Sequence, residues 1–488
     1  MSVPLMKRIL WLLAALFILS YVLYFAYWGL FADFTHDDLM NMYRSMERPY
    51  PALVADNLLF WRPSPTLRPF GALVYKVSLD LFGLNLFPLR VFCYLVLALN
   101  IFLVYALARR LTGSREVGAL AALLHSFHTN LGGLYLNNGT LYDIFCFTFS
   151  YLGLLLYVRV RQQGKWLTPA QIALFSFLLV LALDSKEMAL AIPLLLVAYE
   201  LIYHRPRATA SAIATLLLSA GIAAASYFGR VTGPEGIAQS GAYKTVIGPG
   251  AYLRQTGHYL NELFYRTDWF TAWKTAGFLF VLIAVAVLLR SRKLAFAASL
   301  FVLGILPMAF IPPRGLSAVY IPLAGIAIYL AVLLVWCRDL LLGFLKRLIG
   351  HKPGGSQAWH AATPAAVFLF ALTAYGLVHV HLRLGYFYEA WQKEYGQIRS
   401  VMDQLPRLHP SLPKGAQILV VQDPFEEFNW ASRFIAGLVY RDPYLPVDRL
   451  PSMQPKPDAA EIAKYTIRLT YEDGKLRDLS AAEVPLGP

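Results

Sequence analysis

Long hydrophobic runs with few charges recur along the first 383 residues, and short polar or basic connections separate them. Each run has roughly twenty residues, the length that a helix needs to cross about 30 Å of hydrocarbon. This pattern predicts an α-helical polytopic membrane protein with about eleven transmembrane helices. The predicted spans are about 9–31, 87–108, 116–131, 140–158, 168–184, 188–203, 209–228, 269–289, 294–311, 317–336 and 364–382.

Two long polar segments interrupt this pattern, at 32–86 and 229–268. The first contains an amphipathic stretch, Leu67 to Phe82, that would lie along the membrane surface. We therefore expect residues 1–383 to form one transmembrane domain with two long loops on the same side of the membrane.

The tail from 384 to 488 has a different composition and predicts a small α/β domain. Gln417 to Val421 is typical of a buried strand, and Glu426 to Tyr440 of a helix. Residues 464–477 alternate in polarity around Glu472-Asp473-Gly474-Lys475, a pattern that predicts a β-hairpin.

The composition agrees with a membrane protein: 58% of the residues are hydrophobic and 15% are charged, whereas soluble domains usually have about 25% charged residues. The net charge of +14 does not indicate nucleic-acid binding, because Lys and Arg concentrate in short connections between apolar runs. That distribution places those connections in the cytoplasm. Segments 32–86 and 229–268 and the tail then lie on the outer face of the membrane.

Some kinds of site are excluded by motif. The three cysteines, Cys93, Cys146 and Cys337, lie in or at the end of apolar runs, so they predict neither a disulfide framework nor a cysteine metal site. The sequence also has no glycine-rich phosphate loop, no GxSxG nucleophile motif and no HExxH motif.

An acidic pair, Asp37 and Asp38, follows the first predicted span in Phe34-Thr35-His36-Asp37-Asp38. One interpretation is a helix cap, in which Thr35 or an Asp caps a helix that begins near Leu39. The other is a general base, because a carboxylate can take the proton of an acceptor hydroxyl during group transfer. Both interpretations can hold together.

Several cations are predicted on the same face, each with two interpretations. Arg62 and Arg68 lie in a proline-rich stretch and either anchor to lipid headgroups or bind a phosphate. Lys186 and Glu187 lie at a break between two apolar runs. They form an internal ion pair, extend their charged groups to the membrane interface or, through Lys186, bind a phosphate. Arg314, in the link before span 317–336, is a loop cation or contacts a lipid phosphate.

His125 and His128 are three residues apart in one predicted span, so we expect them to share a helical face. A zinc site needs further ligands, and the nearest polar residues are only Asn130 and Asp143. Polar contacts within the helix bundle are therefore favoured over a metal. We predict no cofactor, and the local sequence does not support a divalent metal.

Taken in order, several short motifs resemble the GT-C glycosyltransferases, which take sugars from polyprenyl-phosphate carriers. The likeness is to the protein O-mannosyltransferase branch and covers about residues 1–340. The motifs are the acidic pair, Arg62-Pro63, Arg68-Pro69, Gly83-Leu84-Asn85-Leu86-Phe87-Pro88, Ala108-Arg109-Arg110-Leu111-Thr112-Gly113, Leu124-His125-Ser126-Phe127-His128, Ser185-Lys186-Glu187-Met188-Ala189 and Tyr320-Ile321-Pro322-Leu323-Ala324-Gly325.

The resemblance implies a transferase that moves a monosaccharide from a polyprenyl-phosphate donor to a lipid, glycan or protein acceptor, with inversion. It implies Asp37 as the catalytic base with Asp38 as its helper. Lys186, Arg314 and Arg62 would hold the donor phosphate. The further substrate-binding candidates are His36, Arg68, His125, His128, Glu187 and Tyr320.

The chain also departs from that branch. Relatives often have a Glu soon after the His-x-x-His pair, where this chain has Asn130. The tail has no 34-residue repeat, so the tetratricopeptide segment of some relatives is absent and their protein acceptors do not transfer. The tail is instead a candidate for acceptor selection.

Two other functions fit a polytopic chain. A transporter or lipid flippase also needs charges at membrane depth, but such folds often show paired halves and interrupted helices near the midplane. The sequence has no evident internal repeat, and its ionisable residues cluster at the outer ends of the spans. A scaffold whose tail does the work would not need the ordered polar set on the outer face.

Overall fold

The structure is a computed structural model that describes residues 3–64, 66, 68–204, 210–232, 244–348, 357–384, 388–425 and 428–485. Part of the predicted outer segment 229–268 lies outside these residues, as do the basic residues Arg205, Arg207 and Lys352. Glu426, where the tail helix was predicted to begin, also lies outside them.

A helix covers most of each predicted span. These helices are α1 (Val3–Ala26), α5 (Phe87–Thr112), α6 (Arg115–Ser126), α8 (Leu141–Arg161), α9 (Pro169–Ser185), α10 (Ile192–Tyr203), α11 (Ala210–Thr232), α13 (Ala272–Leu288), α14 (Arg292–Gly304), α15 (Tyr320–Leu348) and α16 (Gln357–Leu384). Within the described ranges, six helices are long and apolar enough to cross a membrane, and two shorter apolar helices are 169–185 and 272–288. The protein is a multi-pass integral membrane protein, and the number of eleven crossings stays a prediction.

Local signals in the sequence set several helix ends. Thr168 caps α9 by accepting a hydrogen bond from the Gln171 backbone N–H, and Pro169 occupies the first helical position. Helix α5 ends at Gly113, whose φ of 72° suits glycine.

Polar side chains tie the helices together inside the bundle. Asn100 of α5 donates to the Ile144 carbonyl at 3.0 Å and accepts from Thr148 of α8 at 2.7 Å. At the C-terminal end of α8, Arg161 forms two hydrogen bonds of 2.8 Å with Glu200 of α10. Such contacts help to fix neighbouring helices where lipid cannot drive their association.

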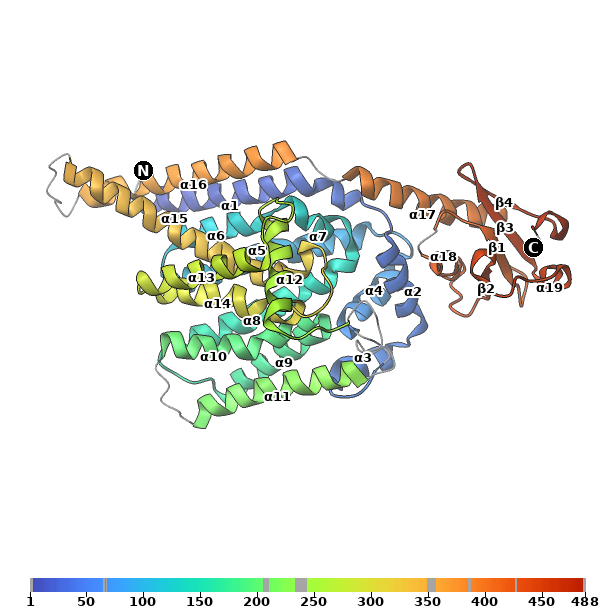
Figure 1. Ribbon diagram of the computed structural model, residues 1–488, viewed down its shortest axis with the longest axis horizontal. Coiled ribbons are helices and arrows are strands. Elements are labelled where there is room, and N and C mark those ends of the chain that lie inside the picture. Colours follow the sequence, from blue (N-terminus) through green and yellow to red (C-terminus); the bar gives the residue numbers. More distant parts are fainter. Residues whose placement is uncertain are drawn as a thin grey trace.

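Shorter helices gather at one end of the bundle (Figure 1). They include α2 (His36–Glu47), α3 (Tyr50–Leu58) and α4 (Pro69–Phe82), which form much of the first predicted outer segment. The amphipathic stretch predicted at 67–82 is therefore largely helix α4. The short helix α7 (Gly132–Leu136) and α12 (Pro249–Leu263) belong to the later outer connections.

The tail begins with α17 (Tyr388–Leu408), which leads from this end of the bundle to a small sheet (Figure 1). The sheet has the order β2-β1-β3-β4, with β1 (Ile418–Gln422) parallel to both β2 (Val447–Arg449) and β3 (Ile467–Glu472). The predicted strand and hairpin are confirmed, since β3 turns at Asp473-Gly474 into the antiparallel β4 (Lys475–Asp478). Helix α18 (Ala431–Tyr440) and the short α19 (Ala459–Lys464) complete the segment. The domain division at 383/384 stays a prediction.

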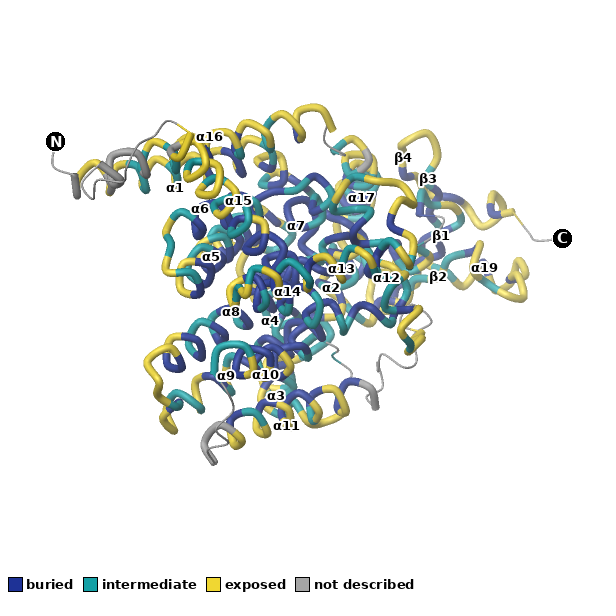
Figure 2. Tube along the Cα trace, turned by 60° about the vertical axis from the view of Figure 1, so that its left-hand side comes forward, coloured by how far each residue is buried: buried dark blue, intermediate teal, exposed yellow. Residues whose placement is uncertain are grey.

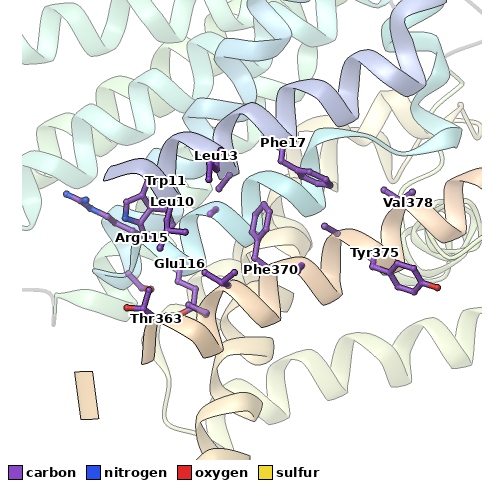
Figure 3. Close-up of a pocket in the computed structure, with 17 residues that line it drawn as sticks. Leu10, Trp11, Leu13, Phe17, Arg115, Glu116, Thr363, Phe370, Tyr375 and Val378 are labelled. Atoms are coloured by element: carbon purple, nitrogen blue, oxygen red, sulfur yellow. The ribbon is translucent and has the colours of Figure 1, made fainter. Parts of the chain in front are cut away.

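An apolar groove of about 900 Å³ runs between α1, α6 and α16 (Figure 3). Phe17 and Phe370 face it, and Arg115, Glu116 and Thr363 lie near one end. Helices α1 and α16 are exposed along much of their outer sides, whereas the buried residues concentrate in the middle of the bundle (Figure 2). None of the predicted site residues lines this groove.

Candidate active site

Asp37 lies in the first turn of α2, at the end of the bundle that faces the sheet. The residue is exposed, and its Oδ2 atom accepts a 2.8 Å hydrogen bond from Asn137 Nδ2. A Cβ atom at Gly139 would lie 2.6 Å from Asp37 Cβ, so only glycine allows the backbone to pass this close. The segment 137–139 therefore orients one side of the carboxylate and leaves the residue open to solvent.

Asp38 has a different environment from its neighbour because it is fully buried. Its Oδ2 accepts from the backbone N–H and the hydroxyl of Thr35, at 3.1 and 2.9 Å, and its Oδ1 accepts from the Tyr75 hydroxyl at 2.9 Å. Arg90 Nη2 lies 3.6 Å from Oδ2. Burial raises the pKa of Asp38, and Arg90 opposes that shift. The capping interpretation is confirmed for Thr35 and Asp38, with the helix starting at His36, earlier than the predicted Leu39.

His36 packs away from Asp37, against the tail. Its ring stacks on Phe428 with 3.8 Å between ring centroids. Its backbone N–H and its Nδ1 atom both lie 2.8 Å from Glu394 Oε1 in α17. In this structure the imidazole is therefore engaged by the tail, and its predicted contact with substrate stays a prediction.

Lys186 forms a buried ion pair at the junction of α9 and α10. Its Nζ atom lies 2.5 Å from Asp143 Oδ1, and both residues are at least nine-tenths buried. The ion-pair interpretation of Lys186 is thus confirmed, but with Asp143 as the partner. Phosphate binding by Lys186 stays a prediction, and a phosphate would have to share the ammonium group with Asp143.

Glu187 is held by two arginines. Arg68 contacts both carboxylate oxygens, at 3.3 and 3.1 Å, and Arg230 Nη1 lies 3.7 Å from Oε1. Burial alone would raise the pKa of Glu187, but the two guanidinium groups lower it to about 2. Arg230 also binds Asp184 at 3.2 Å. Arg68 and Glu187 are therefore brought together as an ion pair.

Tyr142, in the first turn of α8, connects the acidic pair with these cations. The Arg68 guanidinium lies over its ring, 5.3 Å from the centroid. The Tyr142 hydroxyl donates to Asn41 Oδ1 of α2 at 2.8 Å, one turn after Asp37. Asp143, the partner of Lys186, is the next residue along the chain. These contacts join Arg68, Lys186 and Glu187 in one network, which reaches α2, the helix that carries Asp37, through Tyr142 and Asn41.

Arg62 and Arg314 lie at the border of this network. Arg62 is exposed and lines a small cleft together with Asp184 and Arg230. Arg314 is half-buried, and its carbonyl accepts from His258 Nε2 at 3.0 Å. Arg314 and Asp143 are both close enough to Tyr259 to influence its pKa, which burial raises to about 12. Arg62 therefore lies close to Arg230, a partner of Glu187, whereas Arg314 contacts α12. A shared phosphate site for Arg62, Lys186 and Arg314 stays a prediction.

His125 and His128 do not share a helical face, so that expectation was wrong. Helix α6 ends at Ser126, because Phe127 and His128 have extended backbones with φ of −150° and −151°. His125 stacks against Phe147 and Tyr320, which also contact each other, whereas His128 binds the Leu263 carbonyl at 2.9 Å. Their roles in substrate binding, and that of the buried Tyr320, stay predictions.

Metal ligands show no convergence in the part of the chain that the structure describes, where no three His, Cys, Asp or Glu side chains meet as a metal ion would need. The absence of a cofactor stays a prediction.

Sequence reasoning missed several residues that hold the site. Asn137 was recognised only as part of a turn, and Tyr75 and Arg90 were not singled out, although Arg90 at the start of an apolar run was a visible signal. Arg230 was also missed, although its position just after the predicted span 209–228 was a visible signal. Glu394 has no local signal, because its contact with His36 spans 358 residues of sequence.

Comparisons with known proteins concern the family and the fold. A family model described as dolichyl-phosphate-mannose-protein mannosyltransferase matches residues 63–228, about a third of the chain. No curated protein matches the chain. The crystal structure of ArnT from Cupriavidus metallidurans in the apo state has a TM-score of 0.50 and 15% identity, over 97% of this chain and 94% of that one.

The chain therefore has an ArnT-like fold. A second crystal structure, of ArnT from Cupriavidus metallidurans bound to undecaprenyl phosphate, has a TM-score of 0.48 and 14% identity, over 97% of this chain and 99% of that one. The comparisons give no support to the alternative of a transporter or flippase.

Proposed function

We propose that the protein is a membrane glycosyltransferase of the GT-C type. It transfers a monosaccharide from a polyprenyl-phosphate donor to a lipid, glycan or protein acceptor, on the periplasmic face of a bacterial inner membrane. The matched family model, whose description names a dolichyl-phosphate-mannose donor, and the ArnT-like fold support this assignment.

The contrast between Asp37 and Asp38 carries the proposal. A general base must be within reach of an incoming hydroxyl, and Asp37 is exposed with its carboxylate oriented by Asn137. Asp38 has four polar partners and no exposed surface, so it is suited to holding the helix start and not to proton transfer. We therefore assign Asp37 as the base and Asp38 as the residue that fixes its helix.

The cations predicted on the outer face suit an anionic leaving group. In the proposed reaction the acceptor oxygen attacks the anomeric carbon, the bond from that carbon to the phosphate oxygen breaks, and Asp37 takes the hydroxyl proton. The polyprenyl phosphate leaves with the bonding electron pair. Arg62, Lys186 and Arg314 are the proposed contacts for this phosphate, since guanidinium and ammonium groups stabilise the charge that develops there.

The test is a transfer assay with the full chain in lipid nanodiscs. The protein is given undecaprenyl-phosphate donors that carry a labelled sugar, together with lipid, glycan and peptide acceptors. The release of undecaprenyl phosphate is then measured. ArnT from Cupriavidus metallidurans, which has this fold, was crystallised with undecaprenyl phosphate, and this guides the choice of carrier. We expect Asp37→Asn to lower the rate by a factor on the order of 10²–10⁴.

A matched control is Asp473→Asn, which changes an exposed carboxylate in the β3–β4 turn. It should leave the rate unchanged. If wild type releases no undecaprenyl phosphate from any donor, or if Asp37→Asn retains full activity, the assignment is wrong.

A further inference from the structure

Helix α17 of the tail contacts the catalytic segment at three points. Its residues Glu394, Tyr395 and Arg399 lie on neighbouring turns, so their side chains can reach one surface. The partners are Asp33 and His36, which precede Asp37 in the chain, and Leu136, which precedes the Asn137 that binds Asp37.

The first contact holds the start of α2. Glu394 Oε1 lies 2.8 Å from the His36 backbone N–H and 2.8 Å from His36 Nδ1. His36 is the first residue of the helix and the direct neighbour of Asp37. The carboxylate therefore fixes both the backbone and the side chain of that neighbour.

A second contact holds the residue that precedes Asn137. The Tyr395 hydroxyl donates to the Leu136 carbonyl at 2.6 Å, and both residues are buried. Tyr395 packs with Leu136 and Ala32 in a small apolar cluster. Because Asn137 donates directly to Asp37, this contact acts on the other side of the carboxylate.

The third contact is a bidentate ion pair. Arg399 binds the two carboxylate oxygens of Asp33 at 2.6 and 2.7 Å. The Asp33 carbonyl in turn accepts from Arg90, which also lies beside Asp38. Helix α17 thus contacts the stretch before Asp37 at two places, Asp33 and His36.

We propose that Glu394 and Tyr395 are positioning residues, through which α17 orders Asp37 and Asn137 for proton transfer. This assigns the tail a role in the reaction of the transmembrane part. It rests on the proposed function in one respect, namely that Asp37 is the base. Misplacing a catalytic group by about 1 Å can cost on the order of 10²-fold in rate.

The test combines hydrogen exchange with kinetics on the full chain in nanodiscs. The test variant is the double substitution Glu394→Ala with Tyr395→Phe, and the matched controls are Glu389→Ala on the same helix and Tyr440→Phe. Tyr440 also donates to a backbone carbonyl, that of His409 at 2.7 Å, but within the tail. Amide exchange of residues 33–40 and 136–140 is measured by mass spectrometry, together with kcat and the donor KM.

We expect exchange in both segments to rise at least about tenfold in the test variant. The kcat should fall about ten- to hundredfold, with the donor KM within about twofold of wild type, because Asp37 is not proposed to bind the donor. Glu394→Gln keeps an acceptor oxygen for the His36 N–H, so it should recover most of the activity.

The outcomes separate this inference from the proposed function. If exchange in the two segments is unchanged, or if it rises while kcat of an active enzyme stays within twofold, the positioning role is overturned. If exchange rises but wild type transfers no sugar from any donor, the ordering by α17 is supported and the proposed function fails.

Discussion

The Asn137 side chain donates to the carboxylate of Asp37 at 2.8 Å, across a hundred residues of sequence. The same side chain also accepts a hydrogen bond through Oδ1 from the Gly139 backbone N–H at 2.6 Å. This Oδ1 lies 3.1 Å from the Thr35 hydroxyl oxygen, whose single proton is shared between Asn137 and Asp38. Asn137 therefore joins the turn before α8 to the start of α2 and fixes the orientation of the proposed base.

Asn137→Ala should lower kcat about ten- to hundredfold, because the carboxylate loses the group that orients it. In an Asp37→Asn background the same substitution should have little further effect, since residues that act as a unit are not additive. The measurement is a double-mutant cycle on the transfer rate. Asn85→Ala, at an exposed position before α5, is the control; additive losses in the cycle would contradict the prediction.

Asp38→Asn should act on stability more than on chemistry. The substitution leaves Arg90, which is 1% exposed, without a charged partner. Removing one member of a buried pair typically costs about 3–5 kcal/mol. We expect a lower thermal unfolding midpoint, while the rate per folded molecule stays within about tenfold of wild type. An unchanged midpoint with a rate as low as that of Asp37→Asn would instead make Asp38 the base.

Much of the helical framework could be predicted from the sequence, because its signals are local. Apolar runs of membrane length predicted helices, and Asp473-Gly474 predicted the hairpin through backbone positions with φ of 49° and 79°. The cap at Thr35 was also readable, because all its groups lie within four residues.

The partners within the site were not readable in the same way. Lys186 meets Asp143, and Arg68 meets Glu187, only because their helices have a particular rotation and depth in the bundle. When a helix is apolar on all sides, the pattern of hydrophobic residues predicts neither its rotation nor its depth in the bundle. His125 and His128 show the same limit, since three-residue spacing implies a shared face only while the helix continues, and α6 ends between them.

Variants of the Lys186–Asp143 pair can test the structural role of Lys186 separately from its proposed role in phosphate binding. Lys186→Met should destabilise the protein by roughly 3–5 kcal/mol, because Asp143 is 4% exposed and would keep an uncompensated charge. The double variant with Asp143→Leu should recover most of that stability, because a buried ion pair can often be replaced by apolar groups.

The affinity of these variants for undecaprenyl phosphate then tests whether Lys186 binds the donor phosphate. If Lys186 holds the donor phosphate, the stable double variant should bind this lipid at least about tenfold more weakly than wild type, as measured by native mass spectrometry. Lys475→Met, at an exposed position in the tail hairpin, serves as the control for loss of one positive charge. If the double variant binds undecaprenyl phosphate as tightly as wild type, Lys186 does not hold the donor phosphate and its role is the ion pair with Asp143.

Glu187 should make stability depend on pH in acid. Arg68 and Arg230 lower its pKa to about 2 in the folded protein, from an ordinary value of 4.5. A depressed carboxyl pKa contributes stability that is present above the unfolded pKa and is lost as the pH falls through the folded one. The contribution should be about 3 kcal/mol near neutral pH and should decline between about pH 4.5 and 2.

Wild type and Glu187→Gln can be compared by their thermal unfolding midpoints between pH 3 and 7. The midpoint of wild type should exceed that of the variant by a constant amount above about pH 5.5, and the difference should narrow steadily below that. Glu389→Gln, at an exposed position of α17, should show no such trend. A difference that stays constant down to pH 3 would mean that the two arginines do not stabilise the Glu187 carboxylate in the folded protein.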